Sequence, residues 1–119
     1  MDLSNLRLAL SGMNYAPCKS EKELEDQVVT RLDKLGVPFQ RQVIMSKEDR
    51  FDLLVSDGIV IEIKVGGSAG ELLRQVERYA QYESVTHIIV VTTRAAHRKI
   101  LSAGPLHGKS VEVLHVGWF

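Results

Sequence analysis

The sequence predicts an α/β protein in which a mixed sheet is flanked by helices. Apolar residues recur at helical spacing after residue 20 and then at a period of about two between residues 39 and 65; a second helical segment and a buried-strand pattern follow. Consecutive strands followed by a strand-helix-strand unit imply both antiparallel and parallel neighbours, with helices on both faces of the sheet. The expected order is α-β-β-β-α-β-α-β.

Length and composition favour a single domain over residues 1–119, with residues 1–19 as an N-terminal extension. With 119 residues, of which 45% are hydrophobic, the chain is large enough to build one core without covalent staples. The lone Cys18 cannot close an intramolecular disulfide, which agrees with a reducing compartment. The longest aliphatic stretch, 88–91, is far shorter than the roughly 20 residues that cross a bilayer. We therefore expect a soluble cytoplasmic protein that is not secreted and makes no membrane contact.

The main helix of the N-terminal half is predicted to start after Ser20. Residues 20–23 form a capping box, in which the Ser20 hydroxyl accepts from the Glu23 amide and the Glu23 carboxylate returns to the Ser20 amide. Gly36 and Pro38 end the helix. Ahead of it, four leucines would line a short helix: Leu3, Leu6, Leu8 and Leu10.

The remaining elements follow from alternation, breaker residues and apolar runs. The expected strands are Phe39 to Met45, Arg50 to Val55, Ile59 to Val65, Thr86 to Thr92 and Val111 to Val116. A glycine-rich break over 66–70 precedes a second amphipathic helix, Glu71 to Tyr82, and a short helix is expected over Ala95 to Leu101.

Charged residues interrupt one of the apolar strands. Glu62 and Lys64 are two apart, so they project from the same face of the strand. Isolated charges are costly on a buried sheet face unless they are paired or bind metal. One interpretation is a half-exposed strand with an ion pair between Glu62 and Lys64; the other is a functional site.

Asp52 joins this pair only in one register of the preceding hairpin. A three-residue loop over 56–58, with Gly58 in the left-handed conformation, would pair Asp52 with Glu62 and place all three polar groups on one face. A two-residue turn would pair Asp52 with Ile63 and send the carboxylates to opposite faces. The functional interpretation therefore predicts the longer loop.

The chemistry of such a cluster is that of a hard metal ion. Asp52, Glu62 and the carbonyl of Ile63 are oxygen ligands suited to Mg²⁺ or Mn²⁺. The metal would polarise a phosphodiester and lower the pKa of its bound water, and Lys64 would orient that water or stabilise the transition-state charge.

The triplet Asp52, Glu62 and Lys64 resembles the signature of the PD-(D/E)XK nuclease superfamily, with Phe51 in place of the namesake proline. The resemblance implies a restriction-endonuclease-like αβββαβ core and a catalytic glutamate on the helix before the hairpin. Residues 25–36 resemble the first helix of archaeal Holliday-junction resolvases, which places that metal-binding glutamate on Glu25. Glu21, one turn earlier on the same face, is the alternative.

Two further matches are shorter. Gln75 and Tyr79 resemble the Gln-x-x-x-Tyr motif of the RecB and lambda exonuclease branch. This implies that Gln75 approaches the substrate as part of the catalytic set, with Tyr79 supporting it; the alternative is that Tyr79 is part of the core. Residues 116–118, Val-Gly-Trp, resemble the ending of the resolvases.

The charge distribution favours nucleic acid more than the net charge does. The chain has 15 basic and 15 acidic residues, yet residues 84–110 hold four bases and no acid, while residues 21–36 hold five acids and three bases. Such a run of charges is explained either by a solvated helix face or by a phosphate-binding region, and the sequence leaves both interpretations open. The candidates for DNA contact are Arg94, Arg98, Lys99, Arg78 and Tyr79.

Three histidines lie within that basic segment, ten residues apart, a spacing that suits no compact metal site. We expect His87, His97 and His107 to lie at the surface or at strand edges, although His97 beside Arg98 could face phosphate.

Three functions remain open. The first is a Mg²⁺- or Mn²⁺-dependent DNA endonuclease, structure-selective like a resolvase and dimeric because two strands must be cut symmetrically. The second is an end-processing exonuclease of the Gln-x-x-x-Tyr branch. The third is a nuclease fold that only binds DNA or assembles. The first two imply a role in DNA recombination, repair, restriction or phage DNA processing, in a bacterial, archaeal or phage-infected cell.

Overall fold

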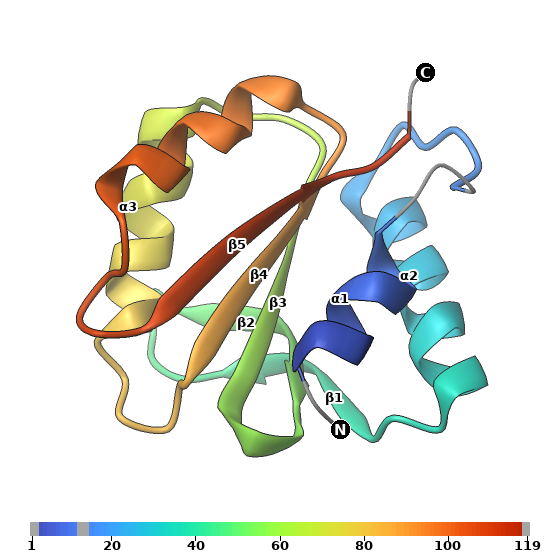
Figure 1. Ribbon diagram of the computed structural model, residues 1–119, viewed down its shortest axis with the longest axis horizontal. Coiled ribbons are helices and arrows are strands. Elements are labelled where there is room, and N and C mark those ends of the chain that lie inside the picture. The colour runs from blue at the N-terminus through green and yellow to red at the C-terminus, as the bar shows by residue number, and fades with distance from the viewer. Residues whose placement is uncertain (1–2, 12–14, 118–119) are drawn as a thin grey trace.

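The computed structural model describes residues 3–11 and 15–117, and it has an α/β architecture built on one mixed sheet (Figure 1). The strands lie in the order β1-β2-β3-β4-β5. Neighbours are antiparallel from β1 to β3 and parallel from β3 to β5. The strands are β1 Phe39–Ile44, β2 Arg50–Val55, β3 Ile59–Lys64, β4 His87–Thr92 and β5 Ser110–His115. The predicted α/β class with a mixed sheet is confirmed.

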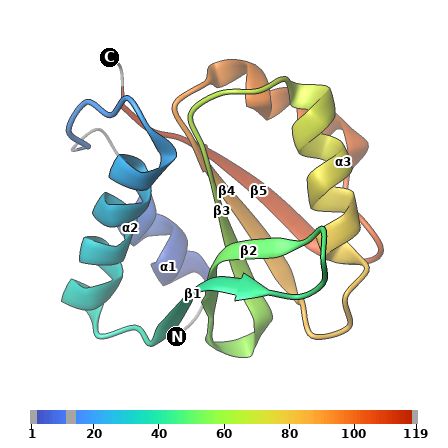
Figure 2. The same cartoon turned by 180° about the vertical axis from the view of Figure 1, so that it is seen from behind.

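Helices cover both faces of this sheet (Figures 1 and 2). The helices α1 (Leu3–Leu10) and α2 (Glu21–Leu35) lie on one face. The helix α3 (Ala69–Ala80) and the 3-10 segment η2 (Ala95–Ala103) lie on the other. Among the described residues, no helix is both long enough and apolar enough to cross a membrane.

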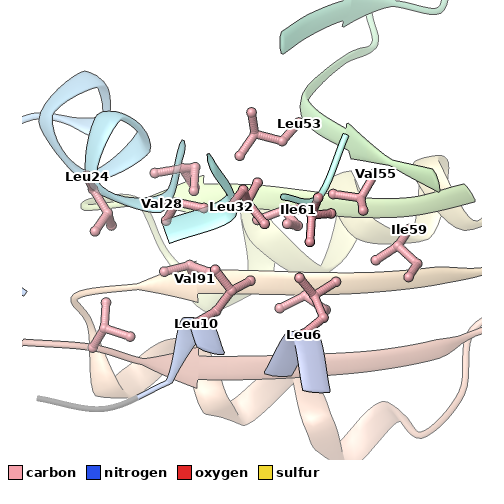
Figure 3. Packing of buried hydrophobic residues seen from close by; sticks show 14 of the residues in the cluster. Leu6, Leu10, Leu24, Val28, Leu32, Leu53, Val55, Ile59, Ile61 and Val91 are labelled. Carbon is pink, nitrogen blue, oxygen red and sulfur yellow. The ribbon is translucent and has the colours of Figure 1, made fainter. Parts of the chain in front are cut away.

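The alternation of β3 divides the core into two clusters. Ile59, Ile61 and Ile63 belong to the cluster that includes leucines of α1 and α2. Figure 3 shows Ile59 and Ile61 among them. Val60 faces α3 on the other side. Glu62 lies between these fully buried strand residues and is itself almost fully buried. The sequence thus places a carboxylate inside the sheet that carries both hydrophobic cores.

The caps of α2 follow the prediction with one difference. The Ser20 hydroxyl accepts from the Glu23 amide, and Gly36 ends the helix at φ 68°. The Glu23 carboxylate, however, accepts from the Lys19 amide at 2.8 Å instead of the Ser20 amide. The extended Ser20 backbone brings the Lys19 N–H within reach, so the box closes one residue earlier than predicted.

Other features of the helices also differ from prediction. The helix α3 starts two residues early, at Ala69, because the Ser68 hydroxyl caps it by accepting from the Glu71 amide. The segment η2 is a 3-10 helix that extends to Ala103. In α1, Leu6 and Leu10 are buried but Leu8 is 74% exposed, since it lies on the opposite side of the helix. The last residue of the resolvase-like ending, Trp118, lies outside the described residues.

The β2–β3 hairpin has the longer loop that the functional interpretation requires. Val55 pairs with Ile59 across a three-residue 3-10 turn, η1 (Ser56–Gly58). Gly58 is left-handed at φ 76°, and so is Asp57 at φ 66°. Gly58 is also tightly enclosed, because a Cβ built there would lie 2.1 Å from the Ser84 carbonyl oxygen. The hairpin turn thus packs tightly against residues 84–86, which lead into β4.

Gly58→Ala is expected to destabilise the protein more than Gly36→Ala. Both glycines have positive φ, for which an L side chain costs about 1–2 kcal/mol. A Cβ at Gly36 meets nothing within 4 Å, whereas at Gly58 it collides with backbone. Urea unfolding of the two variants measures the difference in the free energy of unfolding. Equal losses would show that the turn relaxes freely.

Candidate active site

The strands β2 and β3 separate at Asp52. Their pairing runs from Val55↔Ile59 to Leu53↔Ile61 and stops one pair before Asp52 would face Glu62. The next amide of β3 on this edge, Ile63 N–H, donates to Asp52 Oδ2 at 2.8 Å. In a regular antiparallel ladder the backbone of Phe51 would take that place. A side-chain carboxylate therefore replaces a main-chain partner where the two strands part.

The bend that separates the strands runs through both arms of the β1–β2 ribbon. Opposite Asp52, Gln42 of β1 is left-handed at φ 53°, between the pairs Arg41↔Leu53 and Val43↔Phe51. Phe51 departs from the alternation of Leu53 and packs with the α3 cluster instead. Its ring lies edge-on to Tyr79, with the ring centroids 4.9 Å apart. The far half of the ribbon thus turns toward α3.

The Glu62 carboxylate lies in a buried position, where its ionised form is energetically unfavourable. It is 2% exposed, and within the described part of the chain no hydrogen-bond partner reaches Oε2. Burial, and then the neighbouring Asp52 carboxylate, raises the pKa of Glu62 well above its ordinary value of 4.5, while Lys64 opposes the shift. A buried acid with an unpartnered oxygen is a common mark of a functional site.

The two carboxylates open onto a cleft of about 540 Å³, which we call the catalytic cleft. Lys64, Gln75 and Tyr79 line it together with Asp52 and Glu62. The β1–β2 turn forms another wall, through residues 46–49. The structure therefore brings together the aspartate, the glutamate, the lysine and the glutamine that the sequence singled out.

Gln75 and Tyr79 are coupled as their spacing predicted. Gln75 Nε2 donates to the Tyr79 hydroxyl at 2.9 Å, and that hydroxyl donates to the Arg50 carbonyl at 2.9 Å. Burial and the charge of Glu62 raise the pKa of Tyr79, so the hydroxyl stays protonated. Tyr79 is 2% exposed, which favours a supporting role for it over broad contact with DNA.

The helix glutamates differ in their surroundings. Glu25 is 6% exposed and both of its oxygens accept hydrogen bonds: Oε2 from Arg41 at 2.6 and 2.9 Å, and Oε1 from Gln42 at 2.8 Å. It lines an adjoining cleft of about 530 Å³ together with Asp52. Glu21 lines both this cleft and the catalytic cleft. The structure thus places Glu21 with Asp52 and Glu62, and Glu25 beside them.

No family model, curated protein or solved structure matches the chain. Among the described residues, no three His, Cys, Asp or Glu side chains form a ready metal-binding group. Two carboxylates are nonetheless available, and the free Oε2 of Glu62 is an oxygen that a cation would satisfy. The Ile63 carbonyl is a third donor, because it points to the same side of β3 as the Ile63 N–H, toward Asp52. This donor set fits Mg²⁺ or Mn²⁺, which retains several waters.

The basic residues predicted to contact DNA lie at the rim of the site or beyond it. Arg94, Arg98 and Lys99 are exposed on and just before η2, and none of them lines a cleft described above. Arg78 donates to Asp49 at 3.0 Å. The cations that line the catalytic cleft besides Lys64 are Lys47 and Arg50. Sequence reasoning missed them because only the bend of the β1–β2 ribbon brings them to the site.

The expectation that His97 lies at the surface is wrong. Its side chain is 0% exposed, and its ring joins two segments: Nε2 lies 2.9 Å from the Gly67 carbonyl and Nδ1 lies 2.6 Å from the Thr92 hydroxyl. A carbonyl only accepts, so Nε2 carries the proton. His97 cannot face phosphate, because η2 turns it inward to hold the loop between Lys64 and α3.

Glu62→Gln is expected to change how stability depends on pH. The folded state binds a proton at Glu62 more tightly than the unfolded chain does, so the wild type loses stability as pH rises from about 4.5 through the raised pKa. Glutamine cannot ionise and escapes this loss. Urea unfolding in EDTA should therefore show Glu62→Gln more stable than wild type at pH 8, with the difference shrinking toward pH 4.

Glu77→Gln, at an exposed position of α3, is the matched control and should follow the wild-type profile. Parallel profiles for wild type and Glu62→Gln would show that Glu62 is not held in an unfavourable ionisation state.

Proposed function

We propose that this protein is a divalent-metal-dependent DNA endonuclease with a restriction-endonuclease-like core, selective for DNA structure as resolvases are. The observation that carries the proposal is the pair of carboxylates where β2 and β3 separate. Asp52 is held by the Ile63 amide, and Glu62 is buried with one oxygen free. Both open onto the catalytic cleft beside Lys64. A purely structural ion pair between Glu62 and Lys64 would not explain why Glu62 Oε2 lacks a hydrogen-bond partner among the described residues.

Each residue has a definite task in this proposal. The Ile63 amide fixes the rotamer of Asp52, so that its other oxygen can bind a ligand. Glu62 and the Ile63 carbonyl offer the remaining protein oxygens. A bound Mg²⁺ or Mn²⁺ would polarise the phosphodiester and acidify water at the scissile phosphorus. Lys64 shares the face of Glu62, from which its ammonium group can stabilise the extra negative charge of the transition state or orient the attacking water.

The second candidate function is an exonuclease of the Gln-x-x-x-Tyr branch. The hydrogen bond from Gln75 to Tyr79 supports it, because this bond fixes a glutamine amide on the wall of the catalytic cleft. The same amide serves an endonuclease equally well if it contacts the phosphate beside the cut. The products of cleavage therefore distinguish the two functions.

Recognition of DNA would depend on shape and phosphates more than on bases. The described residues form one α/β unit without a second domain to read a sequence, and phosphate contacts position a protein without reading bases. Symmetric cutting of a junction requires two copies of the site, so a homodimer is part of the proposal. Such an enzyme would act in the cytoplasm on recombining, damaged or phage DNA.

Cleavage of DNA with Mg²⁺ or Mn²⁺ is the decisive test of the proposed function. Circular, linear and four-way-junction DNA are incubated with the wild type and with Asp52→Ala, Glu62→Ala and Lys64→Ala. We expect each substitution to lower the cleavage rate at least about 100-fold, because each removes a charged group from the reacting centre. Circular dichroism verifies that the variants remain folded, and EDTA should abolish cleavage by the wild type.

The products separate the three functions. Internal cuts in circular DNA or symmetric nicks in a junction identify an endonuclease, and a need for free ends identifies an exonuclease. Binding without cleavage under either ion would overturn both and leave the third function, a nuclease fold used only for binding or assembly.

Glu21→Gln and Glu25→Gln distinguish the two candidate helix ligands. Glu21 lines the catalytic cleft, so Glu21→Gln is expected to slow cleavage at least tenfold at low Mg²⁺. It should lower stability by less than about 1 kcal/mol, the contribution of an acid in the first turn of α2. Glu25→Gln removes the charge that Arg41 and Gln42 bind, and is expected to cost about 1–3 kcal/mol of unfolding free energy. Cleavage titrations with Mg²⁺ and urea unfolding measure both. A stable Glu25→Gln variant without activity would assign the ligand to Glu25 instead.

A further inference from the structure

A second cavity continues the catalytic cleft along the start of α3. It measures about 340 Å³, and we call it the basic lobe. Its walls include the loop over 66–68, Glu71, Arg74 and Arg78. Lys64 and Gln75 line both the basic lobe and the catalytic cleft. A chain that lies in the catalytic cleft can therefore continue into the basic lobe across these two side chains.

The two cavities carry opposite charge. The basic lobe has three cations against the single acid Glu71, whereas the catalytic cleft has five acids against three cations. Arg78 is already paired with Asp49. Arg74 is exposed and lies over the first turn of α3, where a Cβ added to Gly70 would be 3.7 Å from its Nη1.

The loop that borders the basic lobe is held in shape from behind. His97 is fully buried and binds the Gly67 carbonyl through Nε2. Its other nitrogen contacts the Thr92 hydroxyl, which accepts from the Arg94 amide. The carbonyl that would repel an anion is thus turned to the His97 ring. No atom lies within 4 Å of a Cβ built at Gly66, so backbone can be approached there.

We propose that the basic lobe binds the DNA backbone phosphate next to the scissile phosphate, with Arg74 as its main ligand. The inference rests on the proposed function, since it locates the lobe relative to the cut. A guanidinium offers several N–H donors in a geometry that matches phosphate oxygens. Lys64, at the boundary, would face both phosphates. The acids of the catalytic cleft and the cations of the basic lobe would then determine the direction in which a DNA strand crosses the site.

Arg74→Gln tests the proposal, with Lys34→Gln as the matched control. Lys34 is an exposed cation at the end of α2, on the other side of the sheet. Binding of a labelled DNA duplex is measured by fluorescence anisotropy with Ca²⁺ at several salt concentrations. Arg74→Gln is expected to weaken binding about tenfold and to lower the slope of log affinity against log salt by about 0.9, the value for one lost phosphate contact. Lys34→Gln should match the wild type.

A second measurement locates the contact. Cleavage is followed on duplexes that carry one neutral methylphosphonate at a time, at the phosphates flanking the cut. The wild type should slow about tenfold at one neighbouring position, and Arg74→Gln should show no further loss there, because charge has been removed from the same contact.

Equal salt slopes for the two variants, or the same methylphosphonate profile in wild type and Arg74→Gln, would overturn the proposal. Failure of the proposed function has a different signature. In that case the wild type cleaves no DNA under any ion, while the anisotropy measurement still decides whether Arg74 binds a phosphate.

Discussion

The hydrogen bond from the Ile63 amide to the Asp52 carboxylate is the interaction on which the candidate site depends. It ends the β2–β3 ladder without leaving a buried amide unpartnered, which would be costly. Once the ladder ends, β2 can turn toward α3, and Phe51 packs beside Tyr79. That turn opens the catalytic cleft above Glu62 and brings Arg50 to its wall. The Asp52 side chain thus ends the pairing of β2 with β3 and allows the catalytic cleft to form beside it.

The surrounding structure supplies the stability that this arrangement lacks. Ionised Glu62 is unfavourable where it lies, as its raised pKa shows. The apolar side chains of β3 are buried in two hydrophobic clusters on opposite faces, so the strand cannot shift to expose the carboxylate without exposing Ile61 and Ile63. Behind the site, His97 joins the loop after Lys64 to the end of β4. Packing therefore holds Glu62 in this position. A bound cation would stabilise its ionised carboxylate there.

Local sequence determined what could be predicted. The start of α2 followed from neighbouring residues, because Ser20 caps the helix. The residues of the hairpin turn allowed two registers, and the structure has the one with the three-residue loop. Glu21 and Glu25 lie one turn apart on one helix face, but Glu21 is exposed, whereas Glu25 is buried and accepts hydrogen bonds from Arg41 and Gln42 of β1. The burial of His97 likewise depends on the distant Gly67 carbonyl. Contacts between remote segments leave no periodic signal in the sequence.

The neutral net charge conceals a separation of charge within one groove. The acids gather where a metal would neutralise them, and the cations Arg74 and Arg78 lie in the adjoining basic lobe. If the protein binds DNA as proposed, the carboxylates of the catalytic cleft would repel, without metal, the same phosphate that Lys64 attracts, so attraction to DNA would be weak at that point. A bound metal ion would reverse the sign of the charge at that point and leave the basic lobe unchanged. In the proposed function, the affinity for DNA and the position of the cut would therefore be governed by different parts of the groove, which the total charge of the chain cannot reveal.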